Sequence, residues 1–582
     1  MSSTFPPDGP PEGPPEGPQS GEPGPEYLEQ GRGGPIAPEP ATSGGGLRRG
    51  LIAGGAILGL AVVGGGVWAA ASFLGQGPQP AEALPASTIG YASVDLDPSG
   101  GQKIEAIQML RKFPAFKEEV GLETDDDIKE KLFDEMNVDE QCDGLDYADD
   151  IEPWLGDRMA VAAVDTGEKE PTVVGVVQVK DADAAEDGFT KLAECGGGSD
   201  NTGWAINGDW ALIADSDEIA EDVADKAADS SLADDDTYQR WIDEVGDAGV
   251  VNMYAAPEAG TFFAENLEGM LDPFGAIAGV DDDAAYSSDV ETSFDDEDMM
   301  EEFSTDEDFP AQPVLPEELT KALEDFEGMA ATLRFDDGAL EFEVAGDPGV
   351  AGDMGLVYDT DGGDDMIATL PDNTAAAVGV GFADGWFSKV LDQAASYSGG
   401  QMSVEDLIAE AEAATGLDLP DDAETLAGES AAFAISADID PEALVNSDSP
   451  EGLPIGVKIK GEPDNIEGVL DKIRSQMGTE GELLVSESDD GVIAIGADEG
   501  YVSELLKDGN LGDSDAFKNV IREADQASSI FFVNFDAGDG WLAELAGDDK
   551  TAKENLEPLQ GLGLSAWQDD DAAHGVLRLT TN

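Results

Sequence analysis

The chain repeats itself, and this repeat constrains the fold more than any other feature of the sequence. Segment 84–96 returns as 370–382, and segment 152–164 returns as 424–436. Further matches follow in the same order: 174–192 with 455–473, 237–245 with 516–524, 250–254 with 532–536, and 261–267 with 540–546. Because self-similarity in a fixed order marks a repeated structural unit, these six matches predict two homologous modules.

Each copy shows the same succession of patterns. Segment 90–96 alternates like a half-buried strand, and segments 158–165 and 173–180 are apolar strands suited to the interior of a sheet. Amphipathic helices are predicted at 184–194 and 215–227. Strand, helix, strand, strand and helix in this order predict ferredoxin-like split βαβ elements. A hairpin ends each copy, at 329–344 and at 563–580.

The predicted fold class is therefore α+β. We expect a single N-terminal transmembrane helix followed by two homologous modules, with mostly antiparallel sheets flanked by helices. The predicted organisation is a disordered Pro/Gly/Glu-rich cytoplasmic tail (1–46), the transmembrane segment (47–75), a linker (76–83), module 1 (84–350) with an acidic disordered insert at about 280–309, a linker (351–369) and module 2 (370–582).

The membrane prediction rests on Leu51 to Leu74, where no residue is charged. About 20 apolar residues suffice to cross a hydrocarbon core. A cleaved signal carries a shorter apolar region of about 7–15 residues near the start of the chain, so a permanent signal anchor is favoured. An Ala-Glu-Ala sequence at 81–83 leaves cleavage open as the alternative.

The flanking cations predict the orientation of this segment. Arg32, Arg48 and Arg49 precede it, and the next basic residue is Lys103. Since basic residues stay on the cytoplasmic side, we expect a single-pass cell-membrane protein with a cytoplasmic N-terminus and its C-terminal bulk extracytoplasmic.

The net charge restricts the partners. The chain holds 128 acidic and 28 basic residues, a formal charge of −100. Binding to phosphate backbones requires clustered Lys and Arg, so nucleic acid is excluded as a general partner. Two explanations of the acidity stay open: adaptation to a saline or cation-rich environment, where salt screens the self-repulsion, and binding of divalent cations.

Two cysteines, Cys142 and Cys195, fall on the predicted external side. They are a disulfide candidate in an oxidising compartment.

The residue types for conventional catalysis are scarce. His574 is the only histidine, and it stands just before the last predicted strand, where we expect an exposed turn residue. No zinc spacing or nucleotide fingerprint occurs. Asp95 and Asp97 would be the candidates for a general acid and base, although Asp97 is more simply a helix cap. We therefore predict no catalytic residue and no cofactor.

Two acidic stretches partly resemble calcium-binding loops. The stretch with Asp359, Asp361 and Asp364 begins like an EF-hand loop, but its glycine and final glutamate fall in the wrong places. Asp536 and Asp539 form a second partial match, which more simply caps a following helix. These residues are weak calcium candidates.

The stretches LRRGLIAGGAILGLAVVGGGVWAA, LPASTIGYASVDLDPSGGQKIEAI with the following KFPAF, and WLGDR at 154–158 carry a family resemblance. From about residue 47 to 582 the chain resembles a family of uncharacterised actinobacterial membrane proteins that bear the domain of unknown function 3352. The resemblance implies a membrane anchor with an external domain, and it implies no activity and no site residue.

Together these observations predict a non-catalytic extracytoplasmic protein that binds, scaffolds or senses at the cell envelope. Its expected partners are the membrane, which it spans once, an unknown envelope protein or polymer, and divalent cations as an option. Two alternatives stay open: an extracytoplasmic hydrolase with paired carboxylates, and a calcium-dependent binding or adhesion module.

Overall fold

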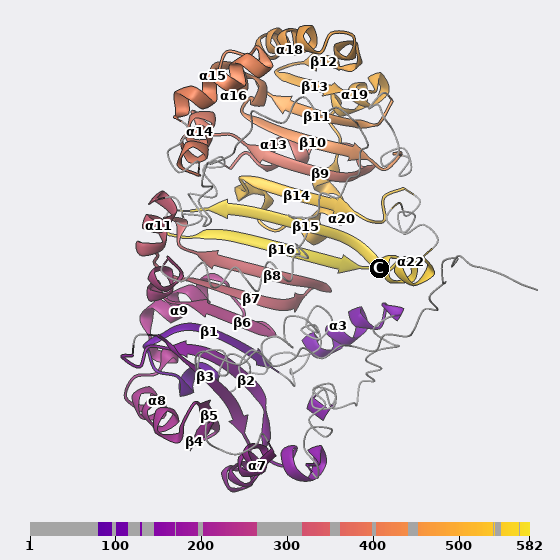
Figure 1. Cartoon of the computed structure of the whole chain (residues 1–582). Coiled ribbons are helices and arrows are strands. Elements are labelled where there is room, and N and C mark those ends of the chain that lie inside the picture. Colours follow the sequence, from indigo (N-terminus) through magenta and orange to yellow (C-terminus); the bar gives the residue numbers. More distant parts are fainter. Residues whose placement is uncertain are drawn as a thin grey trace, which may run out of the picture. The chain divides into compact units, whose positions relative to one another are not determined.

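Sixteen strands form one continuous sheet, in which every neighbouring pair is antiparallel (Figure 1). The first eight strands are β1 (Thr88–Asp95), β2 (Leu155–Val164), β3 (Thr172–Val179), β4 (Gly203–Asn207), β5 (Trp210–Ala214), β6 (Val251–Ala255), β7 (Met329–Asp336) and β8 (Ala339–Gly346). The second eight are β9 (Thr374–Gly381), β10 (Ser430–Ser436), β11 (Ile455–Lys460), β12 (Val485–Asp489), β13 (Val492–Gly496), β14 (Ser529–Asn534), β15 (Leu559–Gln568) and β16 (Ala573–Thr581).

The computed structural model describes only part of the chain. The described residues are 79–95, 101–114, 129–130, 145–168, 170–195, 202–264, 317–349, 361–397, 403–439, 452–538, 541, 549–569 and 571–582. All of them belong to one compact unit, Arg49–Asn582. The predicted tail and transmembrane segment lie outside them. None of the described helices is long and apolar enough to cross a membrane.

The strand order is the same in both halves of the sheet. It runs β4-β5-β3-β2-β1-β6-β7-β8 in the first half and β12-β13-β11-β10-β9-β14-β15-β16 in the second. Local details repeat as well: Thr88 Oγ1 donates to Pro85 O at 2.7 Å, and Thr374 Oγ1 donates to Pro371 O at 2.8 Å. β8 and β16 pair antiparallel, so the two halves are related by an approximate twofold axis at this junction, the seam.

The prediction of two modules, each with its own ferredoxin-like sheets, is wrong. The hairpins predicted at the end of each copy are present, as β7–β8 and β15–β16. Each hairpin would leave its last strand with an unpaired edge. Ala339–Gly346 and the β16 segment from Ala573 pair along these edges instead, which satisfies their backbone groups and merges both copies into one sheet.

The helices lie on both faces of the sheet. They are α3 (Gly101–Leu110), α7 (Ala182–Cys195), α8 (Asp217–Asp229), α9 (Asp236–Glu244), α11 (Glu317–Glu324), α13 (Asp364–Ile367), α14 (Trp386–Tyr397), α15 (Val404–Thr415), α16 (Asp421–Ala427), α18 (Pro463–Met477), α19 (Glu499–Leu505), α20 (Asp515–Val520) and α22 (Lys550–Leu556). Short 3-10 or π turns are η2 (Pro80–Ala83), η3 (Tyr147–Ile151), η4 (Leu232–Asp234), η6 (Glu480–Leu483), η7 (Leu511–Asp513) and η8 (Ala524–Gln526).

Local sequence explains several of these boundaries. Ser216, Asp235 and Ser514 accept hydrogen bonds from backbone N–H groups at the starts of α8, α9 and α20. The β7–β8 turn needs positive φ at both central residues, and Asp337 and Gly338 supply φ of 49° and 77°.

The two faces of the sheet are covered differently. On the inner face, α8 and α9 pack on the first half, with Val223 and Trp241 fully buried. The helices α13, α19 and α20 pack on the second half around Phe517 and Phe532. On the outer face, α7 and α18 cover the strands near the two ends of the sheet, and α3 packs against Phe335 in β7.

The centre of the outer face is apolar, and its most accessible residues are Phe433, Leu564, Leu577, Val378 and Phe531, whereas Phe335, Ala331 and Val533 are buried. Strand pairing places one large apolar residue from each of seven neighbouring strands in a single row, the apolar ridge: Phe433, Val378, Phe531, Leu564, Leu577, Phe342 and Leu333. The rows on either side are Ala431, Val380, Ser529, Ala566, Gly575, Val344 and Ala331, and Ile435, Ala376, Val533, Leu562, Leu579, Leu340 and Phe335.

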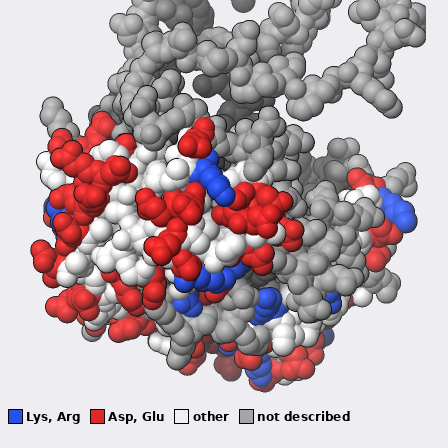
Figure 2. All heavy atoms as spheres, turned by 90° about the horizontal axis from the view of Figure 1, so that it is seen from below, with Lys and Arg blue, Asp and Glu red and all other residues white. Residues whose placement is uncertain are grey.

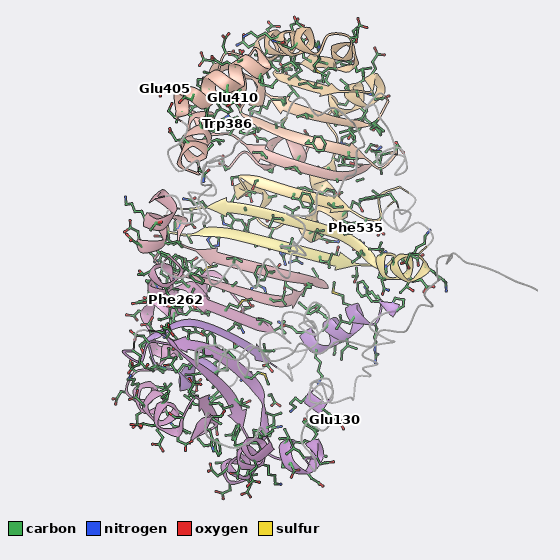
Figure 3. All side chains as sticks on the ribbon, viewed as in Figure 1. Glu130, Phe262, Trp386, Glu405, Glu410 and Phe535 are labelled. Atoms are coloured by element: carbon green, nitrogen blue, oxygen red, sulfur yellow. The ribbon has the colours of Figure 1, made fainter. Side chains whose placement is uncertain are left out.

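The acidic residues lie elsewhere on the surface. Figure 2 shows acidic side chains spread over the end of the molecule that is seen from below, with few basic side chains among them. Glu405 and Glu410 extend outward from α15 in Figure 3, and none of the side chains of that helix is buried. The negative charge of α15 is therefore solvated.

Candidate functional site

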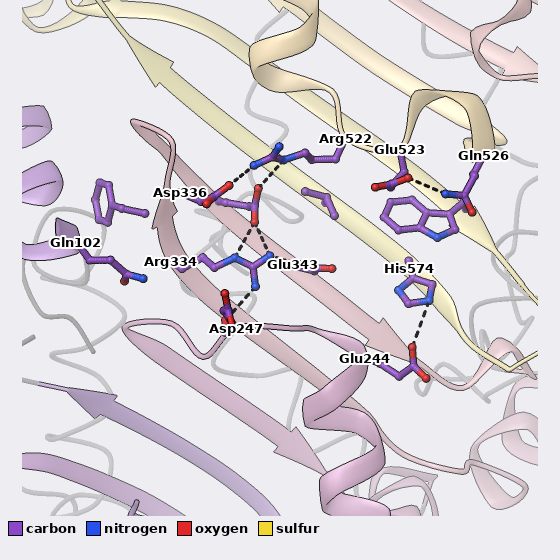
Figure 4. A pocket seen from close by; sticks show the side chains of 14 residues that line it. Gln102, Glu244, Asp247, Arg334, Asp336, Glu343, Arg522, Glu523, Gln526 and His574 are labelled. Carbon is purple, nitrogen blue, oxygen red and sulfur yellow. Dashed lines mark hydrogen bonds and ion pairs between the residues drawn. The ribbon is translucent and has the colours of Figure 1, made fainter. Parts of the chain in front are cut away.

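A cavity of about 480 Å³ lies over the seam on the inner face of the sheet (Figure 4). α9 bounds one side and contributes Glu244, and the residues that follow α20 contribute Arg522, Glu523 and Gln526. The two helices belong to the matched segments 237–245 and 516–524, in which Glu244 and Glu523 hold equal positions. Both copies therefore build the cavity.

Three arginines converge on one carboxylate beside this cavity. Glu341 in β8 is 2% exposed. Arg334 Nε donates to Glu341 Oε1 at 2.8 Å, and Arg522 Nε donates to Glu341 Oε2 at 3.2 Å. Arg578 Nη1, which stands directly opposite in β16, donates to the same Oε2.

Two further carboxylates complete this group, which we call the seam cluster. Arg522 and Arg578 both donate to Asp336 Oδ2, the latter at 3.2 Å, and Arg334 Nη2 donates to Glu343 Oε2. Three guanidinium groups thus face three carboxylates. The balance matters because a buried charge is tolerated only when it is paired and hydrogen-bonded.

The pKa shifts in the seam cluster follow from burial and pairing. Burial raises the pKa of Glu343 above its ordinary value, and the neighbouring Arg334 offsets only part of this shift. For Arg334, burial alone would lower the pKa, but Glu341 and Glu343 outweigh it and the pKa is raised. Arg334 Nη1 also donates to the backbone oxygen of Val245 at 2.7 Å, which ties the cluster to the end of α9.

An aromatic stack forms another part of the cavity wall. The rings of Trp567 and His574 lie 5.0 Å apart and nearly parallel, at 8°. His574 Nε2 lies 4.0 Å from Glu244 Oε2 and 3.9 Å from Asp569 Oδ2. Backbone N–H groups of Asp571 and Ala572 lower the pKa of Asp569, so this neighbour is ionised.

The other imidazole nitrogen is one of six buried side-chain atoms without a hydrogen-bond partner among the described residues. His574 Nδ1 is buried and has no hydrogen-bond partner among the described residues. The side chain of His574 is only 7% exposed and lines the cavity (Figure 4). The expectation of an exposed turn histidine is therefore wrong: His574 lies within β16, opposite Trp567. A buried polar atom of this kind is satisfied when a ligand or water supplies its partner.

The wall limits the chemistry of the cavity. Its described lining residues offer carboxylates, guanidinium groups, amides, one imidazole and aromatic rings, and none of these described residues is a Ser, Thr, Cys or Lys. Among them, no side-chain nucleophile stands beside the histidine as in a catalytic triad. The arrangement suits binding through hydrogen bonds and one aromatic surface.

The structure describes three of the five calcium candidates, Asp361, Asp364 and Asp536. Asp361 and Asp364 are described, and Asp364 opens α13, where burial and the neighbouring Asp365 raise its pKa. Asp536 Oδ1 accepts a hydrogen bond from Asn582 Nδ2 at 3.1 Å. Asp359 and Asp539 lie outside the described residues. Within the described part of the chain, no group of three or more His, Cys, Asp or Glu side chains could hold a metal ion.

The other sequence candidates are only partly placed. Asp95, at the end of β1, is 4% exposed and accepts a hydrogen bond from Arg158 Nε at 3.0 Å, so it serves a buried ion pair. Asp97 and Cys142 lie outside the described residues. Cys195 is the last residue of α7.

Sequence reasoning missed Trp567 and the seam cluster. One signal was present: the sequence holds ten arginines, and Arg334 and Arg578 each interrupt an apolar strand in the hairpins that end the two copies. A lone arginine in an apolar strand needs a buried carboxylate partner, and Glu341 in the adjacent hairpin strand was the available one.

Two regions, 51–202 and 191–489, match the family model described as a protein of unknown function, DUF3352. This match covers more than half of the chain and identifies its family. It gives no information about the source organism or about attachment to a membrane. No curated protein and no solved structure matches the chain.

Proposed function

This chain belongs to the DUF3352 family of proteins of unknown function, and from its own geometry we propose that it is a non-catalytic binding protein of the cell envelope. Its ligand site is the seam cavity. The ligand class is an uncharged, polyhydroxylated fragment of an envelope polymer, such as a short oligosaccharide.

One observation carries this proposal: His574 Nδ1 is buried without a partner among the described residues, in a cavity whose wall includes the face of Trp567. A hydroxyl group is a donor and an acceptor, so it can complete the imidazole nitrogen. An aromatic ring offers an apolar surface on which the C–H face of a sugar ring can pack. Gln526 and Glu523 stand nearby to bind further hydroxyls.

The charge balance favours an uncharged ligand. The three arginines of the seam cluster are matched by three carboxylates, so they do not offer a free positive site for phosphate or carboxylate groups. Glu244, Asp247 and Glu523 add negative charge to the lining, which repels anionic polymers.

The location of the protein is part of the proposal. The uncharged run Leu51–Leu74 and the basic residues before it support a single-pass position at the cell membrane, with the sheet outside the cytoplasm. There the partners are the envelope polymer and, through the acidic surface, loosely held divalent cations. Nucleic acid is no partner. A protease-protection assay on intact cells tests the topology, and digestion of only the first fifty residues would contradict it.

The binding test is a thermal melt of the full-length chain at fixed ionic strength. The probes are soluble N-acetylglucosamine oligosaccharides, CaCl2 and MgCl2. A ligand at one hundred times its Kd stabilises by about 2.7 kcal/mol, which a melt resolves. We expect a shift with the oligosaccharide that is lost in Trp567→Ala. The matched control is Trp386→Ala, whose indole lies on α14 in the second half of the sheet (Figure 3).

The other outcomes separate the alternatives. A shift with calcium alone would replace the saccharide proposal by calcium-dependent binding. Release of shortened oligosaccharides, abolished by Glu523→Gln, would make the protein a hydrolase. Absence of any saccharide shift would contradict the proposed ligand class.

A further inference from the structure

The outer face of the sheet breaks a rule of antiparallel sheets. Such a sheet commonly packs one face on a core and presents polar side chains on the other. Here the three central rows of the outer face, counted over the seven strands from β10 to β7, contain no charged side chain, and Ser529 is their only polar one. The whole chain has 27% charged residues, so this composition is a local departure from the rest of the surface.

The apolar ridge is the most accessible part of this face. Phe433, Leu564, Leu577, Val378 and Phe531 are each 37–41% exposed. Isolated apolar residues on a surface need no explanation, but contiguous patches mark binding sites. Strands lie about 4.8 Å apart, so a row across seven strands extends over about 29 Å.

The described helices leave the ridge open from Phe433 in β10 to Phe342 in β8. α7 and α18 pack near the two ends of the outer face, and the cluster that α3 packs includes Leu333, the β7 end of the ridge, with Leu340 and Leu579 of the row beside it. Figure 1 shows β9, β14, β15, β16 and β8 side by side in this stretch.

We propose that the apolar ridge binds the hydrocarbon chain of an uncharged lipid. The ligand class follows from what the face lacks. All the strands concerned are interior strands paired on both sides, so the face offers no free backbone edge, and Ser529 is the one polar side chain of its three central rows. The binding free energy of a partner on this face therefore comes only from the burial of apolar surface. A hydrocarbon chain binds through apolar burial alone.

Charge decides between the lipid and a second copy of the chain. Two copies that met through this face would each carry a formal charge of −100, and this repulsion opposes association. The same charge repels anionic headgroups. An uncharged lipid meets no such penalty, and the face that receives it is itself uncharged.

The length of the row fits this occupant. The hydrocarbon core of a bilayer is about 30 Å thick and holds two chains end to end, so one acyl chain extends over about half of that distance. The ridge therefore accommodates a full chain. The uncharged run Leu51–Leu74 ends five residues before the first described residue, Gln79, which would keep the sheet close to a lipid source if the proposed location is right.

The test is photolabelling of the full-length protein with vesicles of phosphatidylcholine that contain a few per cent of a diacylglycerol with a diazirine in its acyl chain. Mass spectrometry maps the adducts by peptide. We expect adducts on the peptides of β14, β15 and β16, and about tenfold less labelling there in Leu564→Lys. Met477→Lys, at an exposed apolar position on α18 outside the ridge, is the matched control and retains full labelling.

Other results would overturn the proposal. Absence of adducts on these peptides, or equal labelling with a diazirine fatty acid, which is anionic, would contradict an uncharged lipid at this face. A ridge-to-ridge cross-link between two chains would assign the face to a second copy. If Leu564→Lys loses cooperative unfolding, Leu577→Thr at the directly opposite position takes its place. We expect Trp567→Ala to keep its lipid adducts, because Trp567 lines the cavity on the inner face. Failure of lipid binding and failure of saccharide binding can therefore be distinguished.

Discussion

The two faces of the sheet differ most sharply at the seam, where neighbouring residues of the same strands point to opposite faces and differ in polarity and burial. Glu341 and Arg578 pair on the inner face and are almost fully buried, whereas Phe342 and Leu577 pair on the outer face, where Phe342 is half-buried and Leu577 is 38% exposed. The polar pair is inside and the apolar pair is outside, the reverse of the usual distribution. The inner face can hold charge because the arginines and carboxylates of the two copies match each other there.

The largest effect is expected from breaking this match. Glu341→Gln removes the carboxylate that three guanidinium groups share, and it leaves positive charge buried without compensation. Loss of one partner of a buried pair costs about 3–5 kcal/mol. The free energy of unfolding, measured by denaturant titration, should fall by this amount. Glu327→Gln, at a carboxylate that is 64% exposed, is the control and should change it by less than about 0.5 kcal/mol.

A second pair of variants compares the faces through adjacent residues of β14. Phe532 is fully buried and packs on Phe517, with ring centres 5.4 Å apart, while Phe531 points to the outer face. Phe532→Ala should cost about 3–4 kcal/mol, since it removes buried area and leaves a cavity. Phe531→Ala should cost less than about 1 kcal/mol, because its ring is already in partial contact with water. Equal losses would mean that the outer face is packed.

The smallest expected effect concerns a second buried charge of the inner face. The side chain of Lys458 is 1% exposed, and its Nζ donates to the backbone oxygens of Thr369 and Lys507 at 3.2 Å each. Burial lowers the pKa of Lys458 below its ordinary value. As pH rises through the lowered folded pKa toward 10.5, the unfolded chain holds the proton more strongly than the folded one, so stability rises with pH in this window.

The measurement is the difference in unfolding free energy between the wild type and Lys458→Met at pH 7 and at pH 10. The wild type should gain relative to the variant at the higher pH. Lys518→Met, at an exposed lysine, corrects for the loss of one charge. If the unfolding free energy of the wild type instead falls relative to that of Lys458→Met as pH rises, the folded structure stabilises the Lys458 ammonium.

The sequence predicted the repeated run of strands but not how the copies join. The pairing of the β8 and β16 edges depends on surfaces more than two hundred residues apart, for which a local pattern has no signal. One of the matches was also shifted along the chain. Asn252 pairs with Ser93, and Gly379, which matches Ser93, pairs with Ile530 rather than with Asn534. Short alternating strands look alike at every even shift, because their side chains have a period of two.

The candidate site was less predictable than the fold. Its residues come from both copies and become neighbours only when the seam forms. No residue spacing in the sequence therefore predicts this site. The acidic background also hides the important carboxylates: Glu341 is one of 128 acidic residues, and only its three arginine partners distinguish it.

The pairing of β8 with β16 has a consequence for the order of events during synthesis. β8 ends at Gly346, and its partner β16 begins at Ala573, which is 573 − 346 = 227 residues later. At about 5–20 residues per second, the ribosome needs roughly 10–50 s to make this length. During that time the first half carries an open strand edge next to four residues of the incomplete seam cluster, Arg334, Asp336, Glu341 and Glu343. Chaperone binding to the nascent chain should therefore concentrate in this interval and end when β16 emerges.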